Sequence, residues 1–251
     1  MSEPRHVLVT GAARGIGRAI ASAFVEAGHT VTVLTRTTGS GAATVEAIGA
    51  AGFVAADVSN ETALRAAIES AAHARGPVEI LVNNAGGAQT APLGKMSPAD
   101  LRAMMALNLE PVLVGMQAVV PAMKAAGFGR VVTVASTAGL KGYAYAAAYG
   151  AAKHAVVGLT RSLALELATS GVTVNAVCPG YTDTDLVSGS IDRLEGRTGR
   201  DRADLVAEFT RANPQGRLVA PREVADCVLW LAGDGASAIT GQAIAIAGGE
   251  I

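Results

Sequence analysis

The sequence predicts one α/β domain whose parallel sheet is doubly wound, with helices on both of its faces. Three observations lead to this fold class. Short, almost continuously apolar segments rich in β-branched residues alternate with longer Ala-rich segments, and a glycine-rich turn directly follows the first apolar segment. Strands that are apolar throughout are typical of parallel sheets buried on both faces. The 251 residues suffice for one such domain, and no internal repeat or flexible linker divides them.

The predicted strands are short runs rich in Val, Ile, Leu and Thr. In chain order they cover residues 7–10, 30–35, 52–56, 79–82, 130–136, 172–177 and 242–246. The predicted helices are the longer segments between these strands. They cover residues 16–27, 41–50, 60–75, 97–126, 146–169 and 221–232.

Residues that begin helices stand at three of the expected positions. Ser59 and Asn60 precede an acidic residue, and so do the pairs Ser97-Pro98 and Pro221-Arg222. Polar side chains at such positions satisfy free backbone N–H groups, and proline fits the first helical turn because it has no N–H to satisfy.

Composition and charge exclude several other classes of protein. Half of the residues are hydrophobic and 16% are charged, which is unlike a disordered chain, and the 30 glycines have no collagen period. The most apolar window, residues 107–123, is interrupted by polar residues and is too short a run to predict a membrane-spanning helix. A net charge of −1 provides no electrostatic case for binding nucleic acid or an anionic membrane.

The cysteines and the N-terminal residues indicate a cytoplasmic protein. Cys178 and Cys227 are far apart and form no Cys-x-x-Cys pair, so we expect reduced thiols, with neither a disulfide nor a metal site. The apolar run at residues 7–9 is too short for the core of a secretion signal.

One region has a different composition. Residues 183–226 contain 16 charged residues in 44, about twice the average density of the chain. This density is typical of a solvated helical face. Because the region follows the predicted strand 172–177, we also expect a mobile substrate lid at about 183–215, and the two interpretations are compatible.

The glycine-rich turn predicts a nucleotide site. Gly11, Gly15 and Gly17 lie between the strand 7–10 and the helix 16–27. A strand that turns tightly into a helix directs free N–H groups and the positive end of the helix dipole toward a phosphate. Glycine is needed where the backbone approaches that phosphate closely.

The end of the second predicted strand favours NADP(H) over NAD(H). NAD-binding versions of this turn usually place an acidic residue there, which hydrogen-bonds the ribose 2′-hydroxyl. This chain has Thr35 followed by Arg36, and Arg14 within the glycine turn offers a second positive charge. Two cations and no carboxylate suit a 2′-phosphate.

Tyr149 and Lys153 are the candidate acid–base pair. They lie four residues apart in a predicted helix and therefore share one face of it. An ammonium at ~4 Å favours the phenolate by about 4 kcal/mol, so we expect Lys153 to lower the pKa of Tyr149 toward neutrality. Ser136, at the carboxyl end of the predicted strand 130–136, lies where ligands bind in such sheets and can hold a substrate carbonyl.

These features together resemble the short-chain dehydrogenase/reductases over essentially the whole chain. The motifs are Thr10-Gly-Ala-Ala-Arg-Gly-Ile-Gly17, Asn83-Asn-Ala-Gly86, Asn108, Ser136, Tyr149-Gly-Ala-Ala-Lys153 and Pro179-Gly180. The resemblance implies a single Rossmann domain with a seven-stranded parallel sheet, assembled as a homotetramer. It also implies that the enzyme is an NADP(H)-dependent oxidoreductase.

The resemblance assigns roles to four catalytic residues. Tyr149 would donate the proton to the carbonyl oxygen, and Ser136 would position and polarise that oxygen. Lys153 would bind the nicotinamide ribose, and Asn108 would hold a water that connects Lys153 to solvent.

The resemblance also implies a set of cofactor-binding residues. Asp57 and Val58 would contact the adenine, residues 84–86 would lie along the adenosine, and residues 179–184 would face the nicotinamide. The full set is Gly11, Arg14, Gly15, Ile16, Gly17, Arg36, Asp57, Val58, Asn84, Ala85, Gly86, Tyr149, Lys153, Pro179, Gly180, Thr182 and Thr184.

Within the family, residues 149–158 and 174–180 are most similar to 3-oxoacyl reductases and polyketide ketoreductases. Arg130 matches one basic position that docks an acyl-carrier protein, whereas residues 168–171 lack the second. A carrier-bound substrate, a CoA thioester and a free ketone therefore all remain open. The arginines at 193, 197, 200 and 202 have two interpretations: they bind a phosphate of such a thioester, or they lie on a solvated helix. The acidic residues between them favour the solvated helix.

Three functions remain after the sequence analysis. The leading one is an NADPH-dependent carbonyl reductase that acts on a 3-oxoacyl thioester or a similar ketone. The second is an NAD(P)-dependent secondary-alcohol dehydrogenase working in the oxidative direction. The third is a non-catalytic nucleotide sensor on the same fold, which the presence of both Tyr149 and Lys153 disfavours.

Overall fold

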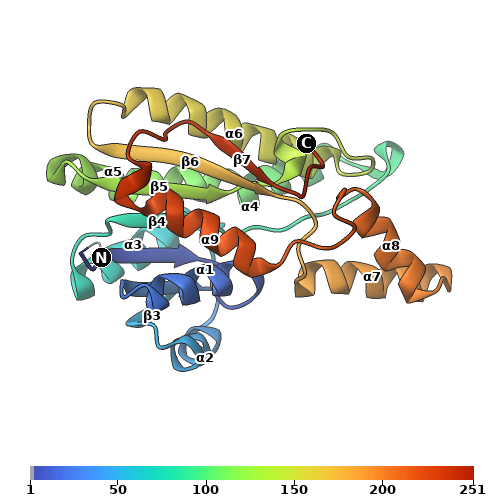
Figure 1. The fold of residues 1–251 in the computed structure, drawn as a ribbon, viewed down its shortest axis with the longest axis horizontal. Coiled ribbons are helices and arrows are strands. Elements are labelled where there is room, and N and C mark those ends of the chain that lie inside the picture. The colour runs from blue at the N-terminus through green and yellow to red at the C-terminus, as the bar shows by residue number, and fades with distance from the viewer. Residues whose placement is uncertain (1–2) are drawn as a thin grey trace.

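A parallel sheet forms the centre of the computed structural model, which describes residues 3–251 (Figure 1). Within these residues it has seven strands, and every neighbouring pair runs parallel. The strands are β1 (His6–Thr10), β2 (Thr30–Thr35), β3 (Gly52–Ala55), β4 (Ile80–Asn83), β5 (Gly129–Val134), β6 (Val172–Pro179) and β7 (Ala243–Ile246). The predicted fold class and all seven predicted strands are therefore confirmed.

The strand order β3-β2-β1-β4-β5-β6-β7 defines where a ligand binds. The chain proceeds outward from β1 to β3 and then returns to β4 on the other side of β1. Ligands of open parallel sheets bind in the crevice at this reversal, outside the carboxyl ends of the strands. The glycine-rich turn after β1 lies at this point.

Helices cover both faces of the sheet (Figure 1). They are α1 (Gly15–Glu26), α2 (Thr38–Ile48), α3 (Glu61–Arg75), α4 (Pro98–Asn108), α5 (Glu110–Ala126), α6 (Ala147–Glu166), α7 (Asp185–Thr198), α8 (Arg202–Arg211) and α9 (Pro221–Ala232). Buried side chains of α3, α5 and α6 form one core with the sheet, and those of α1 and α9 form the other. Burial on both faces explains why the strands are apolar throughout.

Capping residues set the ends of several helices. The Asn60 side chain accepts a hydrogen bond from the Ala63 N–H, and Ser97 forms a reciprocal capping box with Asp100, as predicted. Helix α2 begins three residues earlier than predicted, because the Thr37 hydroxyl accepts from the Ser40 N–H and caps it there.

The single helix predicted over 97–126 is divided at Leu109 into α4 and α5. Pro111 has no N–H, so it cannot donate to the Leu107 carbonyl, and the helical bonding pattern is interrupted there. By length and apolar composition alone, Pro98–Ala126 is able to cross a membrane. In this protein its α5 half packs Val112, Val119 and other apolar side chains against the sheet.

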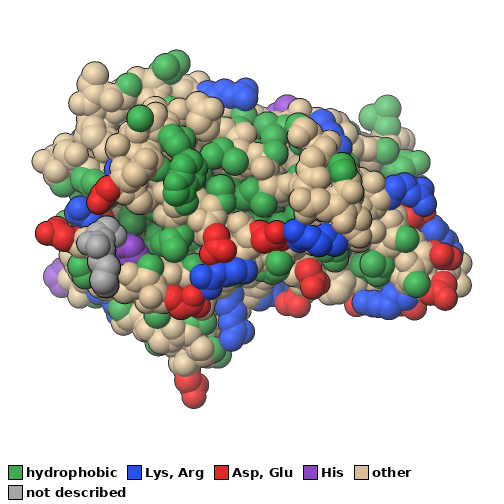
Figure 2. All heavy atoms as spheres, viewed as in Figure 1, with side chains coloured by type: hydrophobic (Ala, Val, Ile, Leu, Met, Phe, Trp, Pro, Cys, Tyr) green, Lys and Arg blue, Asp and Glu red, His purple; other side chains and the backbone are tan. Residues whose placement is uncertain are grey.

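Helices α7 and α8 project beyond the sheet at the right of the view (Figure 1). They have a small core of their own, centred on Val187, Ile191 and Leu205. Charged side chains gather over these two helices (Figure 2). This projection corresponds to the charged segment that the sequence predicts as a lid.

Candidate active site

The turn after β1 is too tightly packed for a side chain at Gly11 or Gly17. Gly11 has a φ of +67°, and a Cβ there would lie 2.9 Å from the Ala85 Cα. A Cβ on Gly17 would overlap the Asn84 amide and the Gly11 carbonyl. Because α1 begins at Gly15, its first N–H groups have no partner within the helix and are free to bind an anion.

Asn84 and Thr10 join the glycine turn to the end of β4. The Thr10 hydroxyl accepts hydrogen bonds from the N–H groups of Asn84 at 2.9 Å and of Ala85 at 3.0 Å. The Asn84 amide in turn donates to the Thr10 and Gly11 carbonyls at 2.9 and 3.1 Å. Asn84 and Ala85 therefore lie against the turn, and their contact with the adenosine stays a prediction. The bracing role of Thr10 was not anticipated, because nothing in the sequence pairs β1 with β4.

The end of β2 is where the sequence predicts binding of a 2′-phosphate. Thr35 is buried at the end of the strand, and Arg36 is exposed beyond it. Hydrogen bonds from Ser59 are the main cause of the lowered pKa of Asp57, and the Arg36 charge lowers that pKa further. Arg36 and Asp57 therefore lie at the same corner. Val58 is half-buried against the core of the sheet.

Arg14 precedes α1 and faces the projecting helices. One of its guanidinium nitrogens lies 4.0 Å from the carboxylate of Asp185, the first residue of α7, and both side chains are largely exposed. Ile16 is half-buried against the core on the α1 side of the sheet. The glycine turn and the base of α7 are thus neighbours, and a Cβ on Gly15 would lie 3.2 Å from the Thr184 methyl group.

The segment that follows β6 runs along this edge of the sheet. Pro179 is the last residue of β6, and the Gly180 N–H donates to the Ile246 carbonyl at 3.0 Å. The buried Thr182 hydroxyl donates to the Gly180 carbonyl at 3.0 Å. Thr184 then precedes α7, and its hydroxyl donates to the Thr182 carbonyl at 3.3 Å. This internal bonding fixes the course of the segment.

Ser136 lies just beyond the strand that was predicted to contain it. Strand β5 ends at Val134, and Ser136 instead precedes the short 3₁₀ helix η2 (Thr137–Gly139). Its hydroxyl oxygen accepts the Ala138 N–H at 3.0 Å, which caps η2. The Ser136 hydroxyl also lies close enough to Tyr149, in the first turn of α6, to influence the pKa of its phenol.

Lys153 lies behind this pair of hydroxyl groups. The side chain is 5% exposed, and its ammonium donates to the Val134 carbonyl at 2.9 Å. The Lys153 nitrogen is 5.8 Å from the centre of the Tyr149 ring. Burial lowers the pKa of Lys153 to about 8.

The pKa of Tyr149 differs in direction from the sequence prediction. Burial raises this pKa, and the nearby Ser136 hydroxyl opposes the rise without cancelling it. The prediction assumed an ammonium ~4 Å from the phenol, whereas Lys153 donates to the backbone of β5 instead. In this structure the phenol is therefore held in its protonated form at neutral pH.

Asn108, the last residue of α4, comes close to Lys153 and the segment after β4. Its side chain is 1% exposed, donates to the Gly87 and Met104 carbonyls, and accepts from the Gly87 N–H. A Cβ on Gly86 would lie 2.6 Å from the Asn108 amide oxygen and 3.9 Å from the Lys153 nitrogen. The water that Asn108 would hold stays a prediction.

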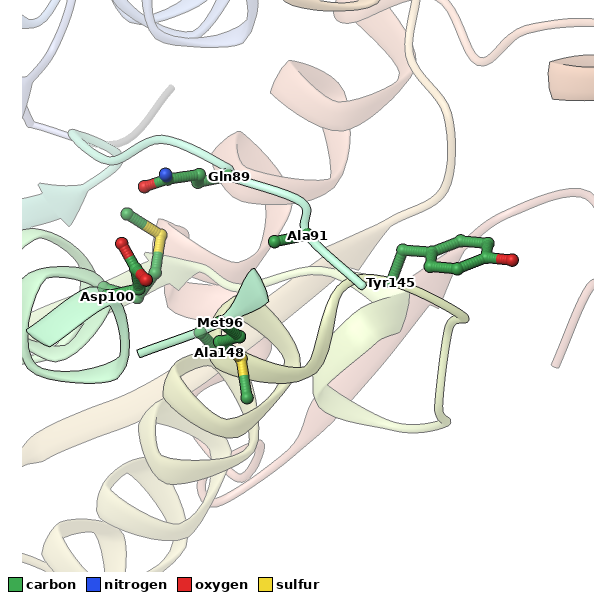
Figure 3. A pocket seen from close by; sticks show the side chains of 7 residues that line it. Gln89, Ala91, Met96, Asp100, Tyr145 and Ala148 are labelled. Carbon is green, nitrogen blue, oxygen red and sulfur yellow. The ribbon is translucent and has the colours of Figure 1, made fainter. Parts of the chain in front are cut away.

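A small cavity lies beside the Tyr149 helix (Figure 3). Its lining includes Gln89, Ala91, Met96, Asp100, Met104 and Ala148. Met104 and Ala148 also pack in one apolar cluster with Tyr149. Tyr145 lies at the edge of this cavity with its ring pointing away from it. The Tyr145 φ of +66° is strained for a residue with a side chain, and its carbonyl accepts the Ala91 N–H.

The structure corrects the predicted docking role of Arg130 and decides between the two interpretations of Arg200 and Arg202. Arg130 is 4% exposed, donates to the Gly129 and Gly171 carbonyls and lies over the Phe128 ring, so it is not available to dock a partner protein. Arg200 and Arg202 are paired with acids of α7 and α8, which favours the solvated-helix interpretation for both.

A second polar group, which the sequence does not predict, lies near Ser136. The Tyr143 hydroxyl and the Lys141 ammonium both donate to the Glu250 carboxylate, and the Tyr143 hydroxyl is also hydrogen-bonded with Thr137. Cys178, at the end of β6, lies close enough to accept a hydrogen bond from the Ser136 N–H, and burial raises its pKa to about 11. No local pattern identifies these residues, because their partners are distant in the sequence.

Comparison with known proteins places this site in one family. Residues 5–194 match the family described as short chain dehydrogenase. The 3-oxoacyl-(acyl-carrier-protein) reductase FabG of Vibrio harveyi is 37% identical over 248 residues, covering 98% of this chain and 97% of its own. The cis-4-hydroxycyclohexanecarboxylate dehydrogenase of Sinomonas cyclohexanicum is 38% identical over 249 residues, covering 98% and 96%. A crystal structure of an actinorhodin polyketide ketoreductase variant with NADPH has a TM-score of 0.94 at 35% identity, covering 99% of this chain and 97% of that one.

Proposed function

The chain belongs to the short-chain dehydrogenase family, and we propose that it uses NADPH to reduce the carbonyl group of a 3-oxoacyl thioester or a similar ketone. The observation that carries the proposal is that the Ser136 and Tyr149 hydroxyl groups are neighbours, with the Lys153 ammonium buried behind them. These groups lie at the carboxyl edge of the sheet, on the side where the glycine turn offers free N–H groups to a phosphate.

The residues of this chain fit NADPH. The turn at Gly11 and Gly17 has no space for side chains and allows a pyrophosphate to approach the backbone. Strand β2 ends with Thr35 in place of the acidic residue that NAD-binding versions of the fold carry there, and Arg36 is exposed beside it. Arg36 and Arg14 would hold the 2′-phosphate, and residues 179–184 would border the nicotinamide. When bound, the cofactor supplies a hydride to the carbonyl carbon.

Tyr149 would act as the proton donor. Ser136 would hold the substrate oxygen next to the phenol through its hydroxyl group, and Tyr149 would then transfer its proton to that oxygen as negative charge develops there. A general acid must be protonated before it reacts, and the raised pKa of Tyr149 meets this requirement at neutral pH. Lys153 would hold the nicotinamide ribose, and Asn108 would link Lys153 to solvent through a water.

The projecting helices would complete the substrate site. Tyr181 packs edge-to-face against Tyr143 at 6.2 Å and against Phe209 of α8 at 4.8 Å between ring centres. This aromatic chain connects α8 to the region of Ser136. We propose that α7 and α8 cover the bound ketone in this way.

A second candidate function is oxidation of a secondary alcohol by the same residues in reverse. The similarity to a hydroxycyclohexanecarboxylate dehydrogenase supports it. In that direction Tyr149 must accept a proton as phenolate, which its raised pKa disfavours at neutral pH. Oxidation would therefore gain rate as the pH increases. The homotetramer and the cytoplasmic location stay predictions.

A substrate screen tests the proposal. We expect the purified chain to oxidise NADPH with acetoacetyl-CoA, an acetoacetyl-acyl-carrier protein or 1,3-cyclohexanedione at pH 7, and to prefer NADPH over NADH. Reduction of none of these, together with oxidation of secondary alcohols at alkaline pH, would favour the second function. Binding of NADPH without turnover in either direction would contradict both.

A further inference from the structure

A buried carboxylate that no catalytic role uses lies at the C-terminal end of the chain. The Glu250 side chain is 2% exposed, and its Oε1 atom accepts hydrogen bonds from the Tyr143 hydroxyl and from the Lys141 ammonium, the latter at 2.9 Å. A carboxylate removed from water is unfavourable unless charged or polar partners compensate it. These two partners meet that requirement, and both lie in the segment that follows Ser136.

Two glycines bring Glu250 to this position. Gly248 and Gly249 follow β7 with φ values of +60° and +95°, which reverse the direction of the chain. A Cβ on Gly248 would overlap the Asn213 side chain. On its other side, Glu250 reaches the end of β6, because a Cβ on Gly180 would lie 3.0 Å from the Glu250 Oε2 atom.

Contacts lead from Glu250 to Ser136 through Tyr143. The Tyr143 hydroxyl lies 2.7 Å from the hydroxyl of Thr137, the residue that follows Ser136. The Thr137 carbonyl accepts the Leu140 and Lys141 N–H groups, which closes residues 137–141 into a tight loop. The segment that follows Ser136 is therefore bonded at both Lys141 and Tyr143 to one carboxylate.

We propose that Glu250 is a positioning residue: its carboxylate fixes residues 137–143 against the end of β6, and so holds the Ser136 hydroxyl beside Tyr149. This inference rests on the proposed carbonyl reduction. A carboxylate suits this role because hydrogen bonds to a charged acceptor are shorter and stronger than neutral ones. A small displacement of a group that orients substrate is enough to lower the rate strongly.

The test compares Glu250→Ala, Glu250→Gln and Tyr143→Phe in the full chain. With acetoacetyl-CoA or 1,3-cyclohexanedione as substrate, we expect Glu250→Ala to lower kcat by about ten- to a hundredfold, with a smaller change in KM. Glu250→Gln keeps an acceptor oxygen and should recover most of the rate. Tyr143→Phe, which removes one hydroxyl, should resemble Glu250→Ala. The Kd for NADPH should stay within about twofold in all three.

Glu79→Ala is the matched control. Glu79 also accepts two hydrogen bonds, from the Arg5 guanidinium at 2.7 Å and the His6 N–H at 3.0 Å, but at the opposite edge of the sheet. We expect this variant to lower Tm without changing kcat. Equal losses of Tm in Glu250→Ala and Glu79→Ala with wild-type kcat in both would mean that Glu250 only stabilises the fold, and would overturn the proposal.

Amide hydrogen exchange of peptides spanning residues 136–143 supplies a readout independent of turnover. Exchange there should accelerate at least about tenfold in Glu250→Ala and stay unchanged in Glu79→Ala. Unchanged exchange in both variants would refute the proposal. A wild-type chain that reduces no ketone would contradict the proposed function, while exchange would still decide whether Glu250 fixes the segment. If Glu250→Ala does not fold, Tyr143→Phe decides the same question.

Discussion

The sheet has an amino edge, where its strands begin, and a carboxyl edge, where they end. The two edges carry similar polar residues that are bonded in different ways. At the amino edge, Arg5 pairs with Glu79, and the buried His6 ring contacts the Gly76 carbonyl and the Thr32 hydroxyl. In each of these contacts both partners belong to this chain. At the carboxyl edge, the first N–H groups of α1 have no partner within the helix, and the hydroxyls of Ser136 and Tyr149 lie at the same edge.

The difference indicates which polar groups stabilise the fold and which ones take part in binding or catalysis. Polar groups at the amino edge satisfy one another, so their loss should lower the free energy of unfolding and leave the rate unchanged. Groups at the carboxyl edge are held in place by neighbours such as Glu250 and Asn84 but offer atoms to a ligand. Their loss should lower rate or affinity and have less effect on stability.

Tyr149→Phe should have the largest effect. It removes the proton donor and keeps the ring in the apolar cluster with Met104 and Ala148. We expect kcat to fall by about 10²–10⁴-fold, with Tm and the NADPH Kd close to wild type. Steady-state NADPH oxidation, fluorescence titration and thermal melting measure the three quantities. Retained turnover would remove Tyr149 from the catalytic role.

Arg36→Asp should change the choice of cofactor. Loss of the guanidinium and gain of a carboxylate at the end of β2 should weaken NADPH binding by about ten- to a hundredfold, because hydrogen bonds to a charged phosphate are lost. NADH binding should change little or improve, since an acid there bonds ribose hydroxyls. Parallel titrations with both cofactors decide the matter, and equal losses would mean that Arg36 does not contact the 2′-phosphate.

The amino edge should show its role in the pH dependence of stability. Burial lowers the pKa values of His6 and His29 below 6.5 in the folded chain. The unfolded chain therefore binds more protons below pH 6.5, so the free energy of unfolding should be highest above that pH and fall as the pH drops through the lowered values. Melting curves at pH 7.5 and 5.5 test this, and His6→Gln should flatten the dependence. A Tm that rises on acidification would contradict it.

Asp185→Asn should have the smallest effect. Asp185 and Arg14 are exposed and 4.0 Å apart, and an ion pair of this kind contributes at most about 1 kcal/mol. Removing the acid frees Arg14 for a phosphate, so the NADPH Kd should fall by less than about fivefold. Glu61→Gln, which breaks the exposed pair with Arg65 on α3, is the control and should leave the Kd unchanged. A weaker affinity in Asp185→Asn would show that the acid supports the site.

The predictions that succeeded rest on local sequence. The glycine turn begins α1 where its spacing indicates, and Tyr149 and Lys153 share a face of α6 because four residues make about one helical turn. The predictions that failed depended on surroundings. Ser136 lies past the end of β5, and Arg130 is enclosed by the backbone of neighbouring segments. The sequence contains Pro111, which interrupts the helix 97–126, but the prediction treated this segment as one helix. The structure divides it at Leu109.

The sequence by itself determined the fold class, the glycine turn that leads into α1 and the shared helical face of Tyr149 and Lys153, since each arises from residues adjacent along the chain or one helical turn apart. The tertiary structure decided the direction of the Tyr149 pKa, because burial depends on everything packed around the phenol. It also decided the partners of Glu250, which lie 107 and 109 residues away along the chain. Parallel strands bring the ends of distant segments to one edge of the sheet, and only the order of the strands fixes which side chains meet there.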